Sequence, residues 1–153
     1  MNKLPLKVTP IAVFIIAAGL IWTCPEWFVW GDYPLPFRIY IVALSLILSG
    51  CFGLSALYSF FVARTTVNPL RPETASTFVC QGVYKISRNP MYLGLCILLV
   101  GFTYWLGNLA GFAFVFGFVC YMNRFQIIPE EKALETLFGE EYRVYKTQVR
   151  RWI

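Results

Sequence analysis

The chain has 153 residues, of which 58% are hydrophobic and only 14% are charged, and its formal net charge is +5. Soluble domains contain about a quarter charged residues, so this composition excludes an ordinary water-soluble fold. The apolar residues form long continuous runs, which are typical of membrane helices and unlike the alternating pattern of a β-barrel. We therefore predict one all-α membrane domain over residues 1–153.

The positive charge is placed beside the apolar runs. We interpret it as a sign of topology and of contact with anionic lipid headgroups, and we expect no nucleic acid partner. The chain has five cysteines without a CxxC pair and no histidine, so we expect neither a disulfide framework nor a metal site. Any chemistry must use carboxylates, arginine, tyrosine, cysteine or the reactivity of the substrate.

The first apolar run follows Lys3 and Lys7 and predicts a membrane span over about residues 8–24. Thr9 suits a helix cap and Pro10 suits the first turn. A charged start before an apolar run is also the pattern of a signal peptide. No small-x-small cleavage site follows, and a belt of interfacial aromatic residues comes next, which favours a retained helix: Trp22, Trp27, Phe28 and Trp30.

The second run predicts a span over about residues 37–63, after a loop at residues 25–36 that holds two acids and no cation. Ser45, Ser49 and Gly53 recur every four residues in this run. Small side chains at this spacing let two membrane helices approach closely, and we interpret the stripe as a packing surface.

A polar segment at residues 64–89 separates this run from two further spans, which we predict over about residues 90–106 and 109–128. Pro69 and Pro72 interrupt any helix in the segment. The last two spans are joined by a tight turn at Gly107-Asn108, and the GxxxG spacing of Gly107 and Gly111 indicates packing.

Residues 129–149 have a different character, because apolar side chains recur there at steps of three and four between charged ones. This pattern predicts an amphipathic helix on the membrane surface, with a break near Gly139. Basic residues flank the N-terminus, the 64–89 segment and the C-terminus. The positive-inside rule then predicts four spans with both termini in the cytoplasm. The Gly82–Gly94 segment and the Glu130–Glu131 pair would share that cytoplasmic face.

The Gly82–Gly94 segment mixes several kinds of binding group. Tyr84 and Tyr92 offer flat faces with polar tips, and Arg88 can hold a carboxylate with a bidentate fork. Asn89 precedes a proline, so we expect an extended backbone with a free side-chain amide. These groups match a zwitterionic ligand that carries an aromatic base, a cationic centre and a diol.

The Glu130–Glu131 pair follows the fourth apolar run. Acids are favoured in a first helical turn by the helix dipole alone, but charge beside a membrane run is costly unless it is paired or functional. We expect one glutamate to pair with an arginine and the other to accept hydrogen bonds from a ligand. Arg124 lies seven residues before Glu131, on the same face if the helix continues; snorkelling to the headgroups is the alternative role for Arg124.

At these positions the chain resembles the isoprenylcysteine carboxyl methyltransferase and phospholipid methyltransferase superfamily. The resemblance covers roughly the last ninety residues and rests on these motifs: Thr65-Thr66, Pro69, Pro72, Gly82-x-Tyr84, Arg88-Asn89-Pro90-Met91-Tyr92-x-Gly94, Glu130-Glu131-x-x-Leu134 and Phe138-Gly139-x-Glu141-Tyr142-x-x-Tyr145. It implies a small integral membrane enzyme that transfers the methyl group of S-adenosylmethionine.

The resemblance also implies a set of site residues. The implied cofactor-binding residues are Tyr84, Arg88, Asn89, Tyr92, Gly94, Glu130 and Glu131, and the implied catalytic residues are Arg124 and Glu131. Asn89 stands where the family usually has histidine, so it can donate a hydrogen bond but cannot carry charge. The acceptor would be an apolar or lipid-like molecule that enters from the bilayer and presents a carboxylate, thiol or amine.

Two alternatives stay open. Membrane sterol reductases have a similar carboxy-terminal pattern and use NADPH, although they are much longer and no clear cluster for a ribose 2′-phosphate is present here. A non-catalytic four-span protein would use the polar clusters for interface and headgroup contacts. Titration with both cofactors and a methyl-transfer assay separate these readings.

Overall fold

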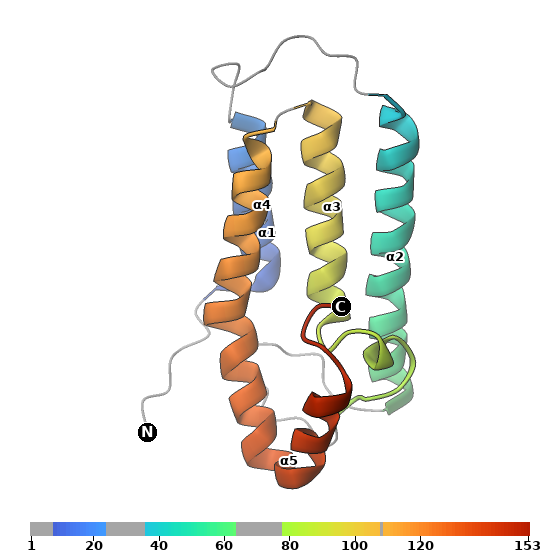
Figure 1. Cartoon of the computed structure of the whole chain (residues 1–153), viewed down its shortest axis with the longest axis vertical. Coiled ribbons are helices and arrows are strands. Elements are labelled where there is room, and N and C mark those ends of the chain that lie inside the picture. Colours follow the sequence, from blue (N-terminus) through green and yellow to red (C-terminus); the bar gives the residue numbers. More distant parts are fainter. Residues whose placement is uncertain (1–7, 24–35, 64–77, 108) are drawn as a thin grey trace.

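The computed structural model describes residues 8–23, 36–63, 78–107 and 109–153, and every regular element in these ranges is helical (Figure 1). The elements are α1 (Pro10–Thr23), α2 (Arg38–Ala63), the short 3₁₀ turn η3 (Gly82–Lys85), α3 (Pro90–Leu106), α4 (Gly111–Tyr121), the π-helix η4 (Met122–Ile127) and α5 (Ile128–Gln148). The predicted all-α class is confirmed. Several predicted features lie outside the described residues: the N-terminal lysines, the aromatic belt at Trp27, Phe28 and Trp30, the acidic loop, the Thr65-Thr66 motif, Pro69, Pro72 and Asn108.

The four long helices form a bundle in which α3 is central. It lies between α2 and α4 and contacts both, and α1 packs on α3 and α4 from behind (Figure 1). The start of α1 follows the prediction, because Thr9 Oγ1 accepts a hydrogen bond from the Ala12 amide at 3.3 Å. The main apolar core lies between α1, α3 and α4, and its largest buried members include Ile21, Leu99 and Met122.

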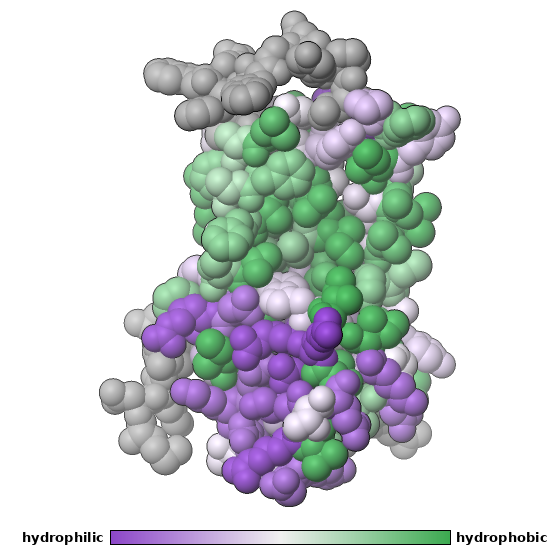
Figure 2. Space-filling view, viewed as in Figure 1, coloured by the Kyte–Doolittle hydropathy of each residue, from purple (hydrophilic) through white to green (hydrophobic). Residues whose placement is uncertain are grey.

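The outer surface of the bundle is apolar, as expected for helices in lipid. Two of the described helices are long and apolar enough to cross a membrane: α2, with 26 residues, and the continuous helix Gly111–Gln148, with 38. The helices α1 and α3 are shorter, with 14 and 17 residues. Exposed apolar side chains on α2 include Ile39, Ile47, Leu54 and Phe61. In Figure 2 hydrophobic surface covers the bundle, and hydrophilic residues gather at the end formed by α5. A membrane protein fits this division; the four-span arrangement stays a prediction.

The small-residue stripe of α2 packs against α3, as predicted. Ser45 and Ser49 are buried, and each faces a glycine of α3. A Cβ atom on Gly101 would lie 2.6 Å from the Ser45 Cβ, and one on Gly94 would lie 3.1 Å from the Ser49 carbonyl oxygen. The two backbones therefore approach as closely as small side chains permit.

The turn between α3 and α4 also follows its predicted chemistry. Gly107 ends α3 in the left-handed region with φ of 70°, which glycine adopts without strain. A Cβ atom on Gly111 would lie 2.7 Å from the Thr103 methyl group, so this glycine permits close packing of the hairpin.

The helix after α4 departs from the prediction in two respects. It continues without interruption through η4 into α5, where a separate surface helix was expected. Pro129 has no amide hydrogen to donate within the helix, and the preceding residues take the wider π-helical turn. This change of register makes the expected alignment of Arg124 with Glu131 wrong, because Arg124 is exposed and Glu131 is buried. The break near Gly139 is confirmed, with φ of 54° and ψ of −125°.

Candidate functional site

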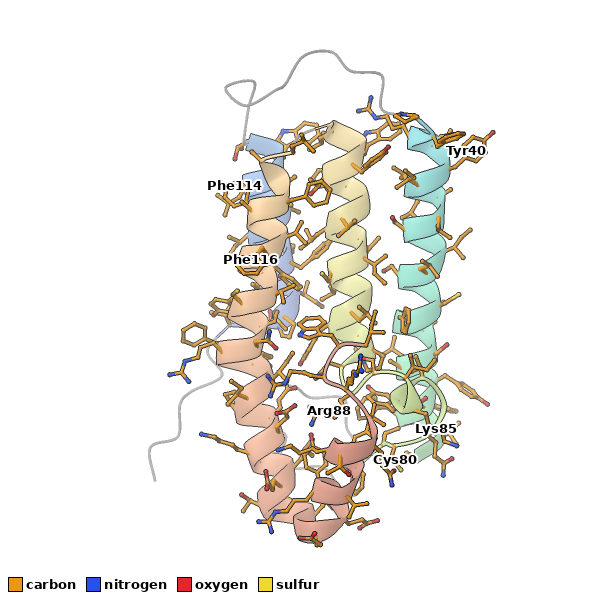
Figure 3. All side chains as sticks on the ribbon, in the orientation of Figure 1. Tyr40, Cys80, Lys85, Arg88, Phe114 and Phe116 are labelled. Atoms are coloured by element: carbon orange, nitrogen blue, oxygen red, sulfur yellow. The ribbon has the colours of Figure 1, made fainter. Side chains whose placement is uncertain are left out.

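Two segments that are distant in sequence meet at the polar end of the bundle. The loop from η3 to the start of α3 faces the first half of α5, and Arg88 reaches from that loop into the space between them (Figure 3). The second half of α5 folds back after Gly139, and the residues after it run beside the same loop (Figure 1). The Gly82–Gly94 segment and the Glu130–Glu131 pair therefore face each other, as the topology argument predicts.

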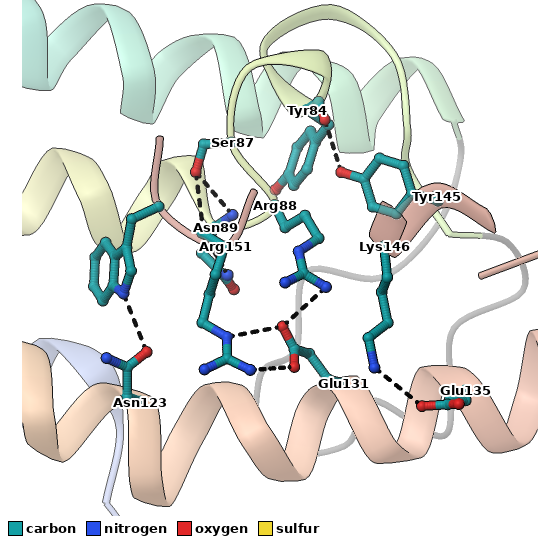
Figure 4. Close-up of polar contacts among 11 residues, drawn as sticks. Tyr84, Ser87, Arg88, Asn89, Asn123, Glu131, Glu135, Tyr145, Lys146 and Arg151 are labelled. Carbon is teal, nitrogen blue, oxygen red and sulfur yellow. Dashed lines mark hydrogen bonds and ion pairs between the residues drawn. The ribbon is translucent and has the colours of Figure 1, made fainter. Parts of the chain in front are cut away.

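Glu131 is at the centre of this contact. Its carboxylate lies 3.3 Å from Arg88 Nη1 and accepts two hydrogen bonds from Arg151, from Nε at 3.0 Å and from Nη2 at 2.7 Å (Figure 4). The side chains of Glu131 and Arg88 are only 8% and 10% exposed, whereas that of Arg151 is 34% exposed. Buried charges need such partners, because removal from water is costly for each ion.

Arg88 has unused hydrogen-bonding capacity. Its Nε and Nη1 atoms are buried and have no hydrogen-bond partner within the described part of the chain. Nη1 has only its 3.3 Å ion-pair contact with Glu131, and Nε has neither an ion pair nor a hydrogen bond among the described residues. Nearly all buried donors in proteins are satisfied, so the unpartnered Nε indicates a place where another group binds. A guanidinium N–H of this kind is suited to a carboxylate oxygen.

Glu130 has a different environment from its neighbour. Its Oε1 atom accepts a hydrogen bond from the Tyr92 hydroxyl at 2.6 Å and one from Gln126 Nε2 at 2.8 Å. Burial raises the pKa of Glu130 to about 7, the two hydrogen bonds act in the opposite direction, and the charge of Glu131 adds to the rise. The two adjacent glutamates thus divide their roles: Glu131 is held by arginines, and Glu130 is a carboxyl group that titrates near neutral pH.

The segment after α5 contacts both the loop before α3 and Glu131 of α5. The Arg88 amide donates to the Arg150 carbonyl at 3.0 Å, and Asn89 Nδ2 donates to the Arg151 carbonyl at 2.9 Å. The expectation of a free Asn89 amide is therefore wrong. Its φ of −132° agrees with a residue before proline, but its ψ of 56° is not extended, and this bend turns the side chain toward the segment after α5. Ser87 Oγ completes the turn by accepting from the Asn89 amide at 3.1 Å.

Tyrosines and phenylalanines of the two halves of the site pack together beside Arg88, Glu131 and Arg151, which we call the ion cluster. Tyr145 donates to the Tyr84 carbonyl at 2.7 Å and so ties the second half of α5 to η3. Phe78 packs its ring on Tyr142 and Tyr145, with centroids 5.6 and 5.7 Å apart. Burial raises the pKa of Tyr142, the charges of Glu131 and Glu130 raise it further, and the charge of Arg88 lowers it. This buried tyrosine therefore lies within the electric field of the ion cluster.

An apolar groove runs along the other side of η3. It has a volume of about 660 Å³ and lies between α2 and the η3 turn. Its lining includes Phe52, Leu54 and Tyr58 from α2 and Val83 and Ile86 from the turn. Leu54, Tyr58 and Ile86 are exposed, so the groove is continuous with the apolar outer surface.

The sequence comparison agrees with this arrangement. The model of the phospholipid methyltransferase family matches residues 37–141, which include η3, Arg88 and the glutamate pair. The chain belongs to the phospholipid methyltransferase family. A protein of Haemophilus influenzae, described as uncharacterized, is 49% identical over 63 residues, which are 41% of this chain and 100% of that protein. No solved structure matches. The family implies membrane methyltransferase activity in general.

Five of the residues that the family resemblance implies for the cofactor site lie in or beside the ion cluster: Arg88, Asn89, Tyr92, Glu130 and Glu131. Tyr84 is buried on η3, and its carbonyl is held by Tyr145. Gly94 lies against Ser49 of α2, where close packing alone accounts for the absence of a side chain. Arg124 is exposed on η4. The cofactor and catalytic roles of all these residues stay predictions.

Sequence reasoning missed several residues that complete the polar cluster of the candidate site. Gln126 could have been found from its spacing, since it stands four residues before Glu130 and bonds to it. Tyr142 was noted only as part of an amphipathic pattern. Arg151 and Trp152 lie beyond the family match and carry no motif. A cation after an amphipathic helix is usually a solvated residue, and only the fold shows that Arg151 returns to Glu131.

Among the described residues no group of three or more histidine, cysteine or acidic side chains could hold a metal ion. The acids of the site are instead bound by arginine, tyrosine and glutamine. These residues offer hydrogen-bond donors and one carboxyl group with a raised pKa, which suits an organic ligand with charged ends.

Proposed function

We propose that the protein uses S-adenosylmethionine to methylate an apolar or lipid-like acceptor at the cytoplasmic face of the membrane. The family supports membrane methyl transfer in general. The specific cofactor is supported by the chemistry of the ion cluster, and the acceptor class by the apolar groove between α2 and the η3 turn. The acceptor group would be a carboxylate, a thiol or an amine. Both termini and the site would lie in the cytoplasm.

The observation that carries this proposal is the buried Arg88 guanidinium, whose Nε has no partner among the described residues and whose Nη1 has only an ion-pair contact with Glu131. The cofactor has an amino-acid end with a carboxylate and an ammonium group. The open guanidinium suits the carboxylate, and the Glu130 carboxyl, once ionised, suits the ammonium or the ribose hydroxyls. The residues present therefore fit the cofactor by charge and by hydrogen-bonding type.

When bound, the cofactor supplies a methyl group that is already activated by its sulfonium charge. The protein then has to hold the donor and the acceptor in line and exclude water. The buried Arg88–Glu131 contact and the tyrosine wall at Tyr84, Tyr142 and Tyr145 suit that task. A carboxylate or thiolate acceptor needs no base. For an amine acceptor, Glu130 could accept the proton, because its pKa of about 7 lies near neutral pH.

The apolar groove supports a lipid-like acceptor. Its lining includes exposed apolar side chains of α2, and it borders the η3 turn, which carries Tyr84 and ends three residues before Arg88. An acceptor with a hydrocarbon tail could lie there without leaving the bilayer, and its polar head would then be at the level of the site.

The choice of cofactor is tested by titrating S-adenosylmethionine and NADPH separately into detergent-solubilised protein and measuring heat. We expect saturable binding of S-adenosylmethionine only. The Arg88→Ala variant should weaken this binding by about tenfold or more, because a charged hydrogen bond contributes roughly 1.5–3 kcal/mol. Arg143→Ala, which removes an exposed cation outside the proposed site, serves as the control for net charge.

Three results of this titration would contradict the proposal. Saturable NADPH binding without S-adenosylmethionine binding would favour the reductase alternative. Binding of neither cofactor would favour a non-catalytic protein. Equal affinity in the native protein and in the Arg88→Ala, Glu130→Ala and Glu131→Ala variants would overturn the placement of the site.

A further inference from the structure

The segment after α5 forms a strap across the two halves of the site. We define this strap as residues 149–152. Its backbone bonds to the loop before α3: the Arg150 carbonyl accepts from the Arg88 amide at 3.0 Å, and the Arg151 carbonyl accepts from Asn89 Nδ2 at 2.9 Å and from Ser87 Oγ at 3.4 Å. The strap is thus fixed on one side by main-chain contacts (Figure 4).

The Arg151 side chain points from the strap to the opposite side, toward α5. Its Nε and Nη2 atoms bind the two oxygens of Glu131 at 3.0 and 2.7 Å. A planar guanidinium that bonds both oxygens fixes the orientation of the carboxylate as well as its position. Arg151 therefore determines how Glu131 is presented to the rest of the site.

The orientation of the Glu131 carboxylate affects the hydrogen bonding of Arg88. The closest approach of Arg88 to Glu131 is 3.3 Å, longer than either contact from Arg151. With Glu131 held by the strap, the Nε and Nη1 donors of Arg88 stay without a hydrogen bond. If Arg151 were absent, Arg88 would be the remaining cation on Glu131 among the described residues, and we expect the carboxylate to turn toward the Arg88 guanidinium and occupy its Nε donor.

We propose that Arg151 is a positioning residue of the cofactor site, which holds Glu131 from the strap so that the Nε donor of Arg88 stays open for the carboxylate of the ligand. This inference rests on the proposed function. It adds to the site a residue that lies outside the stretch matched by the family model, and it assigns the strap a part in ligand binding.

A purely structural strap is the competing explanation, and the structure offers a control for it. Trp152 Nε1 donates to Asn123 Oδ1 at 3.1 Å, which fastens the strap at a point away from Glu131. Arg150 lies next to Arg151 and has an exposed side chain, and only its backbone carbonyl contacts the loop. Asn123→Ala therefore weakens the attachment of the strap without touching Glu131, and Arg150→Ala removes an equal charge.

The experiment measures three quantities for the Arg151→Ala, Arg151→Lys, Arg150→Ala and Asn123→Ala variants in detergent. These are the dissociation constant of S-adenosylmethionine, the melting temperature without ligand, and KM and kcat for methyl transfer to membrane lipids. We expect Arg151→Ala to weaken cofactor binding by roughly tenfold to a hundredfold, the size of effect that misplaced binding groups produce. KM for the cofactor should rise while KM for the acceptor stays unchanged. Arg151→Lys should restore only part of the affinity, because an ammonium group cannot form the fork.

The controls separate the two explanations. Arg150→Ala should bind the cofactor like the native protein, and Asn123→Ala should lower the melting temperature without changing the affinity. For each variant the loss of cofactor affinity is compared with the loss in melting temperature. If the ratio of the two losses is the same in Arg151→Ala and Asn123→Ala, the positioning role is wrong. If Arg151→Ala does not fold, Arg151→Lys decides: native affinity in that variant overturns the inference.

Failure of the inference can be told apart from failure of the proposed function. Native affinity in Arg151→Ala together with weak binding in Arg88→Ala would overturn the positioning role and leave the proposed function standing. No binding of S-adenosylmethionine by the native protein would overturn both.

Discussion

Replacement of Glu131 with alanine is expected to destabilise the protein by about 3–5 kcal/mol, the usual cost of removing one partner from a buried ion pair. Glu131 is 8% exposed and lies between Arg88 and Arg151. Its removal leaves two cations facing each other, one of them nine-tenths buried, without their counter-charge. The loss should appear as a lower melting temperature and as faster hydrogen exchange in the loop before α3.

Two variants sharpen this prediction. Glu131→Gln keeps the shape and one acceptor oxygen but removes the charge, so its melting temperature should lie between those of the native protein and Glu131→Ala. Glu135→Ala removes a carboxylate on the same helix whose ion pairs with Arg143 and Lys146 are far more accessible to solvent than those of Glu131, and such pairs contribute little. A similar loss of stability in Glu135→Ala and Glu131→Ala would show that the buried ion cluster stabilises the protein no more than the ion pairs of Glu135 do.

Affinity for S-adenosylmethionine is expected to rise with pH through about 7, and this rise should disappear in Glu130→Gln. Burial raises the pKa of Glu130 from 4.5 to about 7, so the carboxyl group is largely protonated in mildly acidic buffer. A cationic ligand binds better to the ionised form. The groups that act on Glu130 are Tyr92 of α3, Gln126 of η4, the neighbouring Glu131 and Tyr84 of η3.

The stability of the ligand-free protein should change in the opposite direction. Between pH 4.5 and about 7 the native state holds a proton on Glu130 that the unfolded state has lost. Stability therefore falls as pH rises through this window, and Glu130→Gln should show a smaller fall. Calorimetric titration at a series of pH values measures the affinity, and thermal unfolding at the same values measures the stability.

The control for the pH experiment is Glu141→Gln, which removes an exposed carboxylate from the same helix. It should keep the native profile. Comparison of Glu130→Gln with native protein also cancels any titration of the ligand itself. Identical affinity profiles in native protein and Glu130→Gln would show that Glu130 does not contact the cofactor.

The bundle and the meeting of its two polar clusters could be predicted because each depends on local patterns. Long apolar runs predict helices, and the distribution of cations predicts which loops share a face. The small-residue stripe at Ser45 and Ser49 predicts a close helix contact without naming its partner. The structure adds the partner, since Gly94 and Gly101 of α3 lie against those serines.

The route of the chain after α4 could not be read from its pattern. A helical wheel assumes a constant turn, and the π-helix at Met122–Ile127 changes the register before Glu131. Arg124 is therefore exposed, although seven residues of regular helix would have placed it beside Glu131. The break at Gly139 was expected, but a break in a helix does not specify the direction of the next segment.

The contacts of single polar residues were the hardest to predict. Asn89 is committed to the Arg151 carbonyl, a contact that joins residues 62 positions apart and has no sequence signal. The same holds for Arg151 itself. Arg88 and Glu131 could be found because their neighbours form motifs, whereas the strap that holds them could be found only from the fold.

The measurement that tests the central claim most directly is methyl transfer from S-adenosylmethionine with a labelled methyl group to total membrane lipids and small apolar thiols. The purified native protein should produce labelled material that partitions with lipids. Arg88→Ala should lose most of this activity. If Arg124 has its predicted catalytic role, Arg124→Ala should lose the activity as well. Absence of labelled product with the native protein, or equal labelling by native protein and Arg88→Ala, would contradict the account.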